Sequence, residues 1–278
     1  MQPGIFAKTF TRPTLEEVLD AVTGHGFDCV QFNFACAGLP SMPERVDVEL
    51  TDRIRASMVA RSLRMAAVSG TFNMIHPDPR QRREGLRRLA VLAGSCQSLA
   101  TSVVTLCTGT RDPENMWRWH PDNDSAEAWQ DLLETLGEAL SLTEPCNVIL
   151  AVEPETANVV DSAAKARRLL DELRSPRLKV VIDGANLFRA GELPRMKEVL
   201  DEAFQLLGHD IVLAHAKDVL LDGTEVIHGA AGTGLLDYDQ YLKLLHQSGF
   251  DGPLILHSLA EAQVRDSVAF LRAKLRDP

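Results

Sequence analysis

The sequence lacks any stretch that approaches the ~18 consecutive apolar residues of a membrane-spanning helix. Its first ten residues, Met1–Phe10, also lack a charged leader followed by an apolar segment. The cysteines number five, which is odd, and none of them forms a C-x-x-C pair. This pattern is typical of reduced thiols rather than of a disulfide framework. We therefore expect a cytoplasmic protein that has no membrane partner.

The sequence has fewer basic than acidic residues. It contains 29 Lys and Arg and 39 Asp and Glu, which gives a net charge of −10 at pH 7. A protein that grips a phosphate backbone needs a basic surface, so nucleic acid is not an expected partner. Arg80–Arg88 is the one basic cluster. Apolar residues at helical spacing accompany it, and we expect it to be the solvated face of an amphipathic helix.

A chain of 278 residues with 45% hydrophobic residues is long enough for one large α/β barrel or for two ordinary domains. Its central stretch favours the barrel. Asn147–Glu155 and Arg177–Phe188 are apolar runs that end in polar residues, and both are expected to be strands. Between them, Asp161–Leu173 keeps Ala and Leu at helical spacing, with Asp161 suited to be the N-cap. The unit is a strand, a helix and a parallel strand.

The same alternation continues along the whole chain. The expected strands are Gly4–Phe10, Cys29–Phe34, Arg64–Asn73, Thr101–Thr110, Asn147–Glu155, Arg177–Phe188, Ile211–Val219 and Pro253–Leu259. The expected helices are Thr14–Phe27, Thr51–Leu63, 78–99, 125–142, Asp161–Leu173, Leu193–Gly208, Asp237–Phe250 and Ala260–Leu275, and Leu220–Tyr238 is expected to be a Gly-rich loop.

Eight strand–helix units are the number in a (β/α)₈ TIM barrel, which we expect as a single domain over residues 1–278. The rival is a doubly wound open sheet. That fold needs fewer strands and usually has a Gly-rich fingerprint after its first strand. The turn that follows Gly4–Phe10 has no such fingerprint, so the barrel is preferred.

Polar residues gather where the expected strands end, which in a barrel is the end that carries the chemistry. They are Asn33, Asn73, His76, Thr108, Arg111, Glu153, Glu155, Asp183, Asn186, His215, Lys217, Asp218 and His257. A packed barrel can bury one or two such groups in hydrogen bonds, but a dozen at one rim exceeds what stability requires. This gathering is the strongest functional signal in the sequence.

Four of these residues, Glu153, Asp183, His215 and His257, come from four successive strands. Carboxylate oxygens and imidazole nitrogens around one point suit Mn²⁺, Co²⁺, Zn²⁺ or Mg²⁺. Each residue taken singly has an ordinary explanation, such as a capping role for Asp183 or a buried ion pair between Glu153 and Lys217. The joint placement favours a site for one divalent metal ion.

The motifs AVEPE (151–155), VVIDGANLF (180–188), AHAKD (214–218) and GTFNMIHPD (70–78) resemble the xylose-isomerase-like TIM-barrel superfamily, in particular its sugar phosphate isomerase/epimerase branch. The resemblance implies that Glu153, Asp183 and His215 bind one divalent metal ion. The sequence departs at the fourth ligand, where His257 stands in place of a glutamate.

In relatives that epimerise ketoses, the glutamates of the fifth and eighth strands pass a proton while the metal stabilises an enediolate. The resemblance therefore implies catalytic roles for Glu153 and His257. Three roles for His257 stay open, namely the fourth metal ligand, a proton carrier, and a structural residue. A nitrogen that binds the metal cannot also act as the base.

Other rim residues are of types that bind sugars. Asn73, His76 and Asn186 suit hydroxyl groups, Lys217 suits an anionic oxygen, and the aromatic face of Trp117 suits a sugar ring. The expected substrate-binding residues are Asn73, His76, Arg111, Trp117, Glu155, Asn186 and Lys217. The Gly-rich segment Gly229–Gly234 resembles a phosphate cradle only loosely, because no Lys-Ser/Thr follows it.

The leading hypothesis is a metal-dependent isomerase or epimerase of a small sugar, a sugar phosphate or a polyol-derived ketose. One alternative is a metal-dependent hydrolase of the same superfamily, although its abasic-site endonucleases need more ligands and a cationic surface. Another is a sugar-binding barrel without catalysis, in which His257 marks a lost acid. The resemblance alone also suggests a homodimer, since members of the superfamily often form one.

Overall fold

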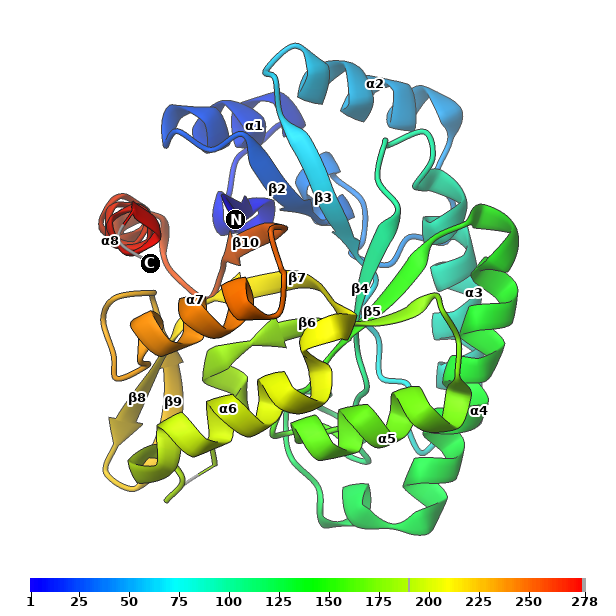
Figure 1. Ribbon diagram of the computed structural model, residues 1–278. Helices are drawn as coiled ribbons and strands as arrows, with labels where there is room; N and C mark the ends of the chain where they lie inside the picture. Colours follow the sequence, from blue (N-terminus) through cyan, green and yellow to red (C-terminus); the bar gives the residue numbers. More distant parts are fainter. Residues whose placement is uncertain (190, 277–278) are drawn as a thin grey trace.

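In the computed structural model, which describes residues 1–189 and 191–276, eight parallel strands close into a barrel with helices around it (Figure 1). The barrel strands are β1 (Gln2–Phe6), β2 (Cys29–Phe32), β3 (Arg64–Ser69), β4 (Val103–Cys107), β5 (Ile149–Glu153), β6 (Leu178–Asp183), β7 (Ile211–Ala216) and β10 (Pro253–Leu256). Their order around the barrel is β1-β10-β7-β6-β5-β4-β3-β2. The expected (β/α)₈ barrel is confirmed.

The helices lie outside the strands and cover them with their apolar faces (Figure 1). They are α1 (Leu15–Gly24), α2 (Val48–Val59), α3 (Pro79–Ser95), α4 (Ala126–Thr143), α5 (Ala163–Leu173), α6 (Met196–Leu207), α7 (Tyr238–Gln247) and α8 (Val264–Arg276). In α5 the buried residues Ala163, Ala166, Leu169 and Leu170 recur at helical spacing. This pattern fixes the side of the helix that faces the barrel.

Local signals set several element ends. Thr14 caps α1 in the expected box with Glu17. The prediction of Asp161 as the cap of α5 is wrong by one position, because the Ser162 side chain accepts the bond from the Lys165 amide. Asp161 is instead paired with the Lys165 ammonium (2.9 Å) and with Arg189. A carboxylate one residue before the cap can therefore serve ion pairs.

The sixth strand is shorter than predicted. β6 stops at Asp183, and Gly184–Leu187 forms a short 3₁₀ turn, η5, instead of continuing the strand. The Ala185 amide donates a hydrogen bond to Asp183 Oδ1 (3.0 Å). This bond turns the chain at the barrel rim and fixes one oxygen of the carboxylate.

The predicted Gly-rich loop over Leu220–Tyr238 is wrong in its first half. β8 (Asp218–Asp222) and β9 (Glu225–Gly229) form an antiparallel hairpin there. The turn contains Gly223, whose φ of +61° is a conformation that glycine adopts at little cost. The hairpin follows β7 directly, and it carries His228 to the mouth of the barrel.

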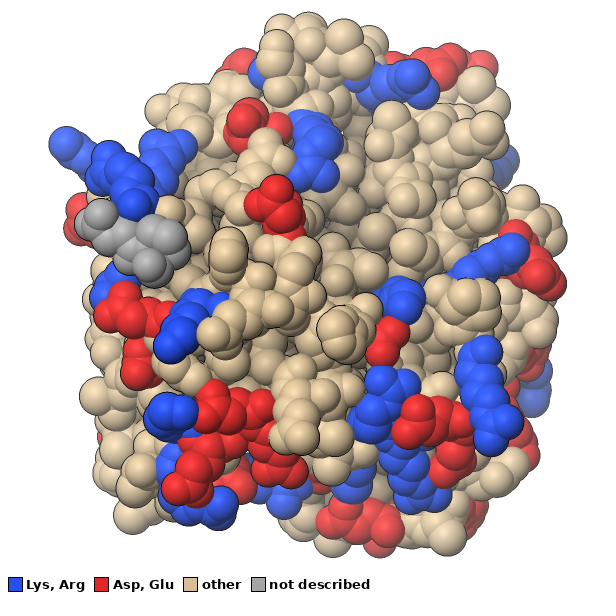
Figure 2. Space-filling model, in the orientation of Figure 1, with Lys and Arg blue, Asp and Glu red and all other residues tan. Residues whose placement is uncertain are grey.

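Charges of both signs lie interspersed on the face drawn in Figure 2, and acidic side chains adjoin basic ones around its margin. The basic cluster of α3 follows the same pattern, because Arg88 pairs with Glu84 (2.5 Å) and Glu44 (2.8 Å). Among the described residues, none of the helices has the length and apolar character needed to cross a membrane.

Candidate metal centre and cavity

A cavity of about 590 Å³ opens at the C-terminal ends of the barrel strands. Its wall is mostly polar near the strand ends, where Glu153, Glu155, Asn186, His215, Lys217 and His257 contribute side chains. This is the end of the barrel at which the sequence predicts the functional residues. The volume is in the range of sites that hold small molecules.

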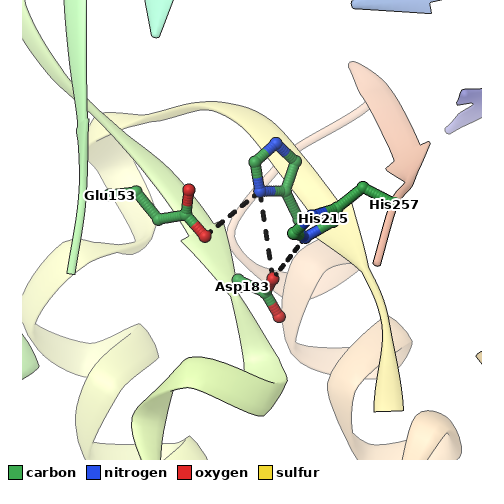
Figure 3. Close-up of side chains that lie close together, drawn as sticks. All are labelled: Glu153, Asp183, His215 and His257. Carbon is green, nitrogen blue, oxygen red and sulfur yellow. Dashed lines mark hydrogen bonds and ion pairs between the residues drawn. The ribbon is translucent and has the colours of Figure 1, made fainter. Parts of the chain in front are cut away.

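Glu153, Asp183, His215 and His257 lie close together (Figure 3). Glu153, His215 and His257 line the cavity, and the fully buried Asp183 side chain lies behind them. Each residue offers one ligand atom, and the four atoms all lie within 4.8 Å of one another. The strand register explains part of this closeness, because Asp183 and His215 are direct partners on β6 and β7. The structure thus brings together the four residues that the sequence singles out as a metal site.

The histidines link the two carboxylates (Figure 3). His257 Nε2 lies 2.8 Å from Asp183 Oδ2, and His215 Nδ1 lies 3.2 Å from Glu153 Oε1. The other nitrogen of each ring has a neutral partner, which is Gln31 Oε1 (2.8 Å) for His215 and Ser258 Oγ (3.1 Å) for His257. Neutral partners on the outer nitrogens are a common feature of histidines that bind metals.

Asn186 and Lys217 contact the same two carboxylates, Asn186 that of Glu153 and Lys217 that of Asp183. Asn186 Nδ2 donates to Glu153 Oε1 (2.6 Å), and the Lys217 ammonium donates to Asn186 Oδ1 and lies 3.4 Å from Asp183 Oδ2. Lys217 is only 4% exposed, so its charge needs the carboxylates nearby. The neighbouring carboxylate of Asp218 binds backbone amides instead of Lys217.

The surroundings keep both inner carboxylates charged. Burial disfavours the charge of Asp183, but Lys217 and the bond from His257 outweigh burial and lower the pKa of Asp183. Burial likewise opposes the charge of Glu153, and the neighbouring His215 imidazole reverses that effect and lowers the pKa of Glu153. Burial, together with His215, lowers the pKa of His257 to about 4. His257 is therefore neutral at pH 7, as a ligand must be.

Glu155 lies two residues beyond Glu153 and faces the same cavity. Its Oε1 accepts a bond from the Thr156 hydroxyl (3.3 Å) and a long one from the Ala157 amide (3.5 Å). Burial raises the pKa of Glu155. These contacts are weak for a buried carboxylate, so hydroxyl groups that enter the cavity can bind it.

Three predicted substrate-binding residues lie in the loops around the cavity, where their side chains bind backbone groups. Asn73 Oδ1 accepts from the amides of Thr110 (3.0 Å) and Ile75 (3.3 Å). His76 Nε2 donates to the Pro113 carbonyl (3.2 Å). Arg111 is 8% exposed, and its Nη1 donates to the Ile75 carbonyl (3.0 Å).

Arg111 also pairs with Asp131 of α4 at 2.7 Å. That contact holds the loop after β4 against the helical ring. Asn73, in the loop after β3, binds the backbone of Thr110 in the loop after β4. Arg111, in the loop after β4, binds the backbone of Ile75 in the loop after β3. The two side chains therefore join these loops. Their placement supports a role in positioning these loops.

The loop after β4 carries two tryptophans with different surroundings. Trp117 lines the cavity together with Met116, although its side chain is 57% exposed. Trp119 is 50% exposed and belongs to the same loop, but the cavity wall does not include it. Asn123 fixes the far end of the loop, since its Oδ1 accepts from the Arg111 amide (2.7 Å). This bond ties the far end of the loop to its start, and Trp117 lies between the two, where it lines the cavity.

The Gly-rich segment Gly229–Gly234 and the residues after it surround the side chain of Asp218. Gly232 N donates to Asp218 Oδ2 (2.9 Å), and Leu236 N donates to Oδ1 (2.9 Å). A phosphate cradle needs amides that point at the ligand. Here two of the amides are turned onto a carboxylate of the protein, which disfavours a phosphate site in this loop.

Sequence reasoning missed Gln31 and His228. Gln31 interrupts the apolar strand β2 and is 5% exposed, and a polar residue in the middle of a buried strand is a signal that could have found it. His228 lines the cavity from β9, and its Nε2 donates to the Ala185 carbonyl (3.2 Å). The sequence of this hairpin predicts an irregular loop, so nothing in it points to His228 as a cavity residue.

The donor set of the cluster suits a divalent ion. Two carboxylates and two neutral imidazoles supply a charge of −2, which balances a 2+ ion, and their oxygen and nitrogen atoms are the ligands that Zn²⁺ and Mn²⁺ accept. Gln31 Oε1 can only accept, so His215 Nε2 carries a proton. Its Nδ1 then faces the Glu153 oxygen at 3.2 Å, and Nδ1 is the nitrogen of His215 that would bind an ion held by the four residues.

Comparisons with known proteins agree with the barrel. The model of the xylose isomerase-like TIM barrel family matches residues 19–274, whereas no curated protein matches the sequence. Similar solved structures include 3-keto-D-glucoside 4-epimerase from E. coli, which is 16% identical with a TM-score of 0.73, covering 98% of this chain and 99% of that one. D-Psicose 3-epimerase from Clostridium cellulolyticum, solved with D-tagatose, is 15% identical with a TM-score of 0.72, covering 99% of each chain.

A third similar structure, the IolI protein with a bound zinc atom, is 15% identical with a TM-score of 0.73, covering 100% of this chain and 97% of that one. Identities this low carry the fold and not the activity. The family match is stronger evidence than these structures, because it spans nearly the whole sequence from the first helix to the last. The chain belongs to the xylose isomerase-like TIM barrel family.

Proposed function

We propose that the protein is a divalent-metal-dependent isomerase or epimerase of a small sugar or related polyol-derived ketose. The observation that carries the proposal is the convergence of Glu153, Asp183, His215 and His257, whose ligand atoms lie within 4.8 Å of one another, and three of which line the cavity at the strand ends. The similar epimerase structures, and the zinc atom of the IolI protein, support this reaction class and a metal site.

A divalent ion held by the four residues would polarise a ketose carbonyl and stabilise the negative charge that develops when the neighbouring carbon loses a proton. Glu153 is the proposed proton carrier. Its Oε1 already accepts the Asn186 amide and faces His215, so the second carboxylate oxygen is left to take the proton. Lys217 and Asn186 would hold the oxygens of the sugar, and Glu155 would accept bonds from its hydroxyl groups.

Solvent deuterium exchange tests the proposed function. The purified protein, loaded in turn with Mn²⁺, Co²⁺, Zn²⁺ or Mg²⁺, is incubated in D₂O with a panel of ketoses and ketose phosphates. We expect deuterium to appear on the carbon next to the carbonyl in at least one ketose, and only with metal present. Bound metal without exchange in any sugar would contradict the proposal and favour a hydrolase or a sugar-binding barrel.

Trp117 offers a prediction about sugar binding. Its ring stands at the cavity mouth, where an aromatic face can cover the apolar side of a sugar. We expect Trp117→Ala to raise KM for the sugar by about 5- to 10-fold, which corresponds to the ~1 kcal/mol of one aromatic contact, with little change in kcat. Steady-state kinetics measure the effect on the substrate that the exchange assay identifies.

Trp119→Ala is the matched control, because Trp119 is similarly exposed in the same loop but lies outside the cavity wall. It should leave KM unchanged. Equal KM values for the Trp117 variant and the native protein would show that the ring does not contact the sugar.

A further inference from the structure

Gln31 lies inside the barrel, and its two side-chain atoms have different partners. Its Oε1 accepts a hydrogen bond from His215 Nε2 (2.8 Å), and its Nε2 donates one to Thr105 Oγ1 (3.1 Å). Gln31 is 5% exposed and Thr105 is 4% exposed. We propose that Gln31 is a positioning residue that fixes the tautomer of His215, so that the lone pair of His215 Nδ1 faces the metal centre. The inference rests on the metal site of the proposed function but not on the sugar.

The direction of the amide decides which nitrogen of His215 carries the proton. A neutral imidazole has a single N–H, and the carbonyl oxygen of Gln31 can only accept. The proton is therefore held on Nε2, and Nδ1 presents a lone pair toward Glu153 Oε1 at 3.2 Å and Asp183 Oδ2 at 3.9 Å. If the amide were turned around, its NH₂ would donate to Nε2, and the proton would move to Nδ1, where it would block the ligand atom.

Thr105 gives the NH₂ group of Gln31 a hydrogen-bond partner on the side away from His215. It belongs to β4, two strands along the barrel from β2, which carries Gln31, and its hydroxyl accepts from the NH₂ of Gln31. Both residues are largely buried at the wall of the cavity, so the loss of either partner leaves a polar group with few replacements in the protein. The chain from Thr105 through Gln31 to His215 is a fixed outer layer of the site, comparable to the partners that orient metal-binding histidines in general.

Ser258 gives the internal contrast. Its hydroxyl touches the outer nitrogen of His257 at 3.1 Å, but it can donate as well as accept, and the residue is exposed. It therefore permits either tautomer of His257, and water can take its place when it is removed. Ser258→Ala changes an outer partner of a ligand just as a Gln31 variant does, without the constraint that we assign to Gln31.

The test measures metal affinity without sugar. Apo protein is titrated with Zn²⁺ and with Mn²⁺ in competition with a chromophoric chelator, for the native chain and for the variants Gln31→Met, Gln31→Glu, Thr105→Val and Ser258→Ala. We expect Gln31→Met to weaken binding by ~10- to 100-fold, the usual effect of losing an outer partner of a metal ligand. Thr105→Val should weaken it less but in the same direction, while Gln31→Glu, which keeps an acceptor, and Ser258→Ala should bind nearly as the native protein does.

A spectroscopic readout separates this role from general packing. Imidazole ¹⁵N shifts of the zinc-loaded protein show which nitrogen is protonated, and His215→Gln identifies the signal of His215. We expect Nε2 to be protonated in the native protein. A proton on Nδ1, or a Gln31→Met variant that binds metal as tightly as Ser258→Ala does, would overturn the proposal. If Gln31→Met does not fold, Thr105→Val decides by the same criteria, and a failed deuterium exchange would leave all of these outcomes unaffected.

Discussion

Asp183→Ala is expected to weaken the binding of a divalent ion by more than ~100-fold while the barrel stays folded. A direct ligand should cost more than the ~10- to 100-fold typical of outer partners. The variant also removes the acceptor for His257 Nε2 and for the Ala185 amide. We expect this loss of buried bonds to reduce the free energy of unfolding by about 1–3 kcal/mol, which a domain of ordinary stability survives. Chelator competition measures affinity, and thermal unfolding followed by circular dichroism measures stability.

Asp161→Ala is the matched control for Asp183→Ala. Asp161 is also nearly buried, at 5% exposure, and it also pairs with cations, namely Lys165 and Arg189. It does not belong to the group of four side chains that could hold a metal ion. We expect this variant to lose stability to a similar degree and to bind metal as the native protein does. Metal affinity that survives in Asp183→Ala would show that Asp183 is not a ligand.

The barrel and the closeness of the four residues of the candidate metal centre could be predicted because both depend on the strand pattern alone. Buried parallel strands all end on the same side of a barrel, so the acid or histidine that ends each strand must lie near the others. Asp183 and His215 are direct register partners for this reason. The prediction needed only the positions at which the strands end, and small errors in the strand lengths did not disturb it.

The roles of the loop residues depend on partners that the strand pattern does not reveal. Arg111 follows a strand and is as polar as Lys217, yet it pairs with Asp131 of the neighbouring helix and binds the Ile75 carbonyl. Which partner a long side chain finds is decided by the path of the loop, and local sequence says little about that path. The hairpin β8–β9 shows the same limit, because its turn residues also suit an irregular loop.

The reaction that we expect depends on whether His257 is a metal ligand or a proton carrier. Its Nε2 lies 2.8 Å from Asp183 Oδ2, and its pKa near 4 keeps the ring neutral at pH 7, which suits a metal ligand. As a ligand it cannot carry a proton, so Glu153 remains as one carrier. A single carrier suits the movement of a proton between adjacent carbons on one face of an enediol, whereas inversion at one carbon needs groups on both faces. We therefore expect isomerisation to dominate over epimerisation in the native protein.

Two substitutions test this assignment. We expect His257→Ala to weaken metal binding by at least ~10-fold, whereas a pure proton carrier would leave metal binding unchanged and lose only turnover. His257→Glu replaces an imidazole with a carboxylate and restores the ligand pattern of the family. It should retain the metal and gain epimerisation relative to isomerisation, because a second carboxylate then stands across the site from Glu153. Product analysis by NMR in D₂O measures the ratio. If neither variant changes metal content or turnover, His257 has a structural role only, and the assignment of the fourth ligand fails.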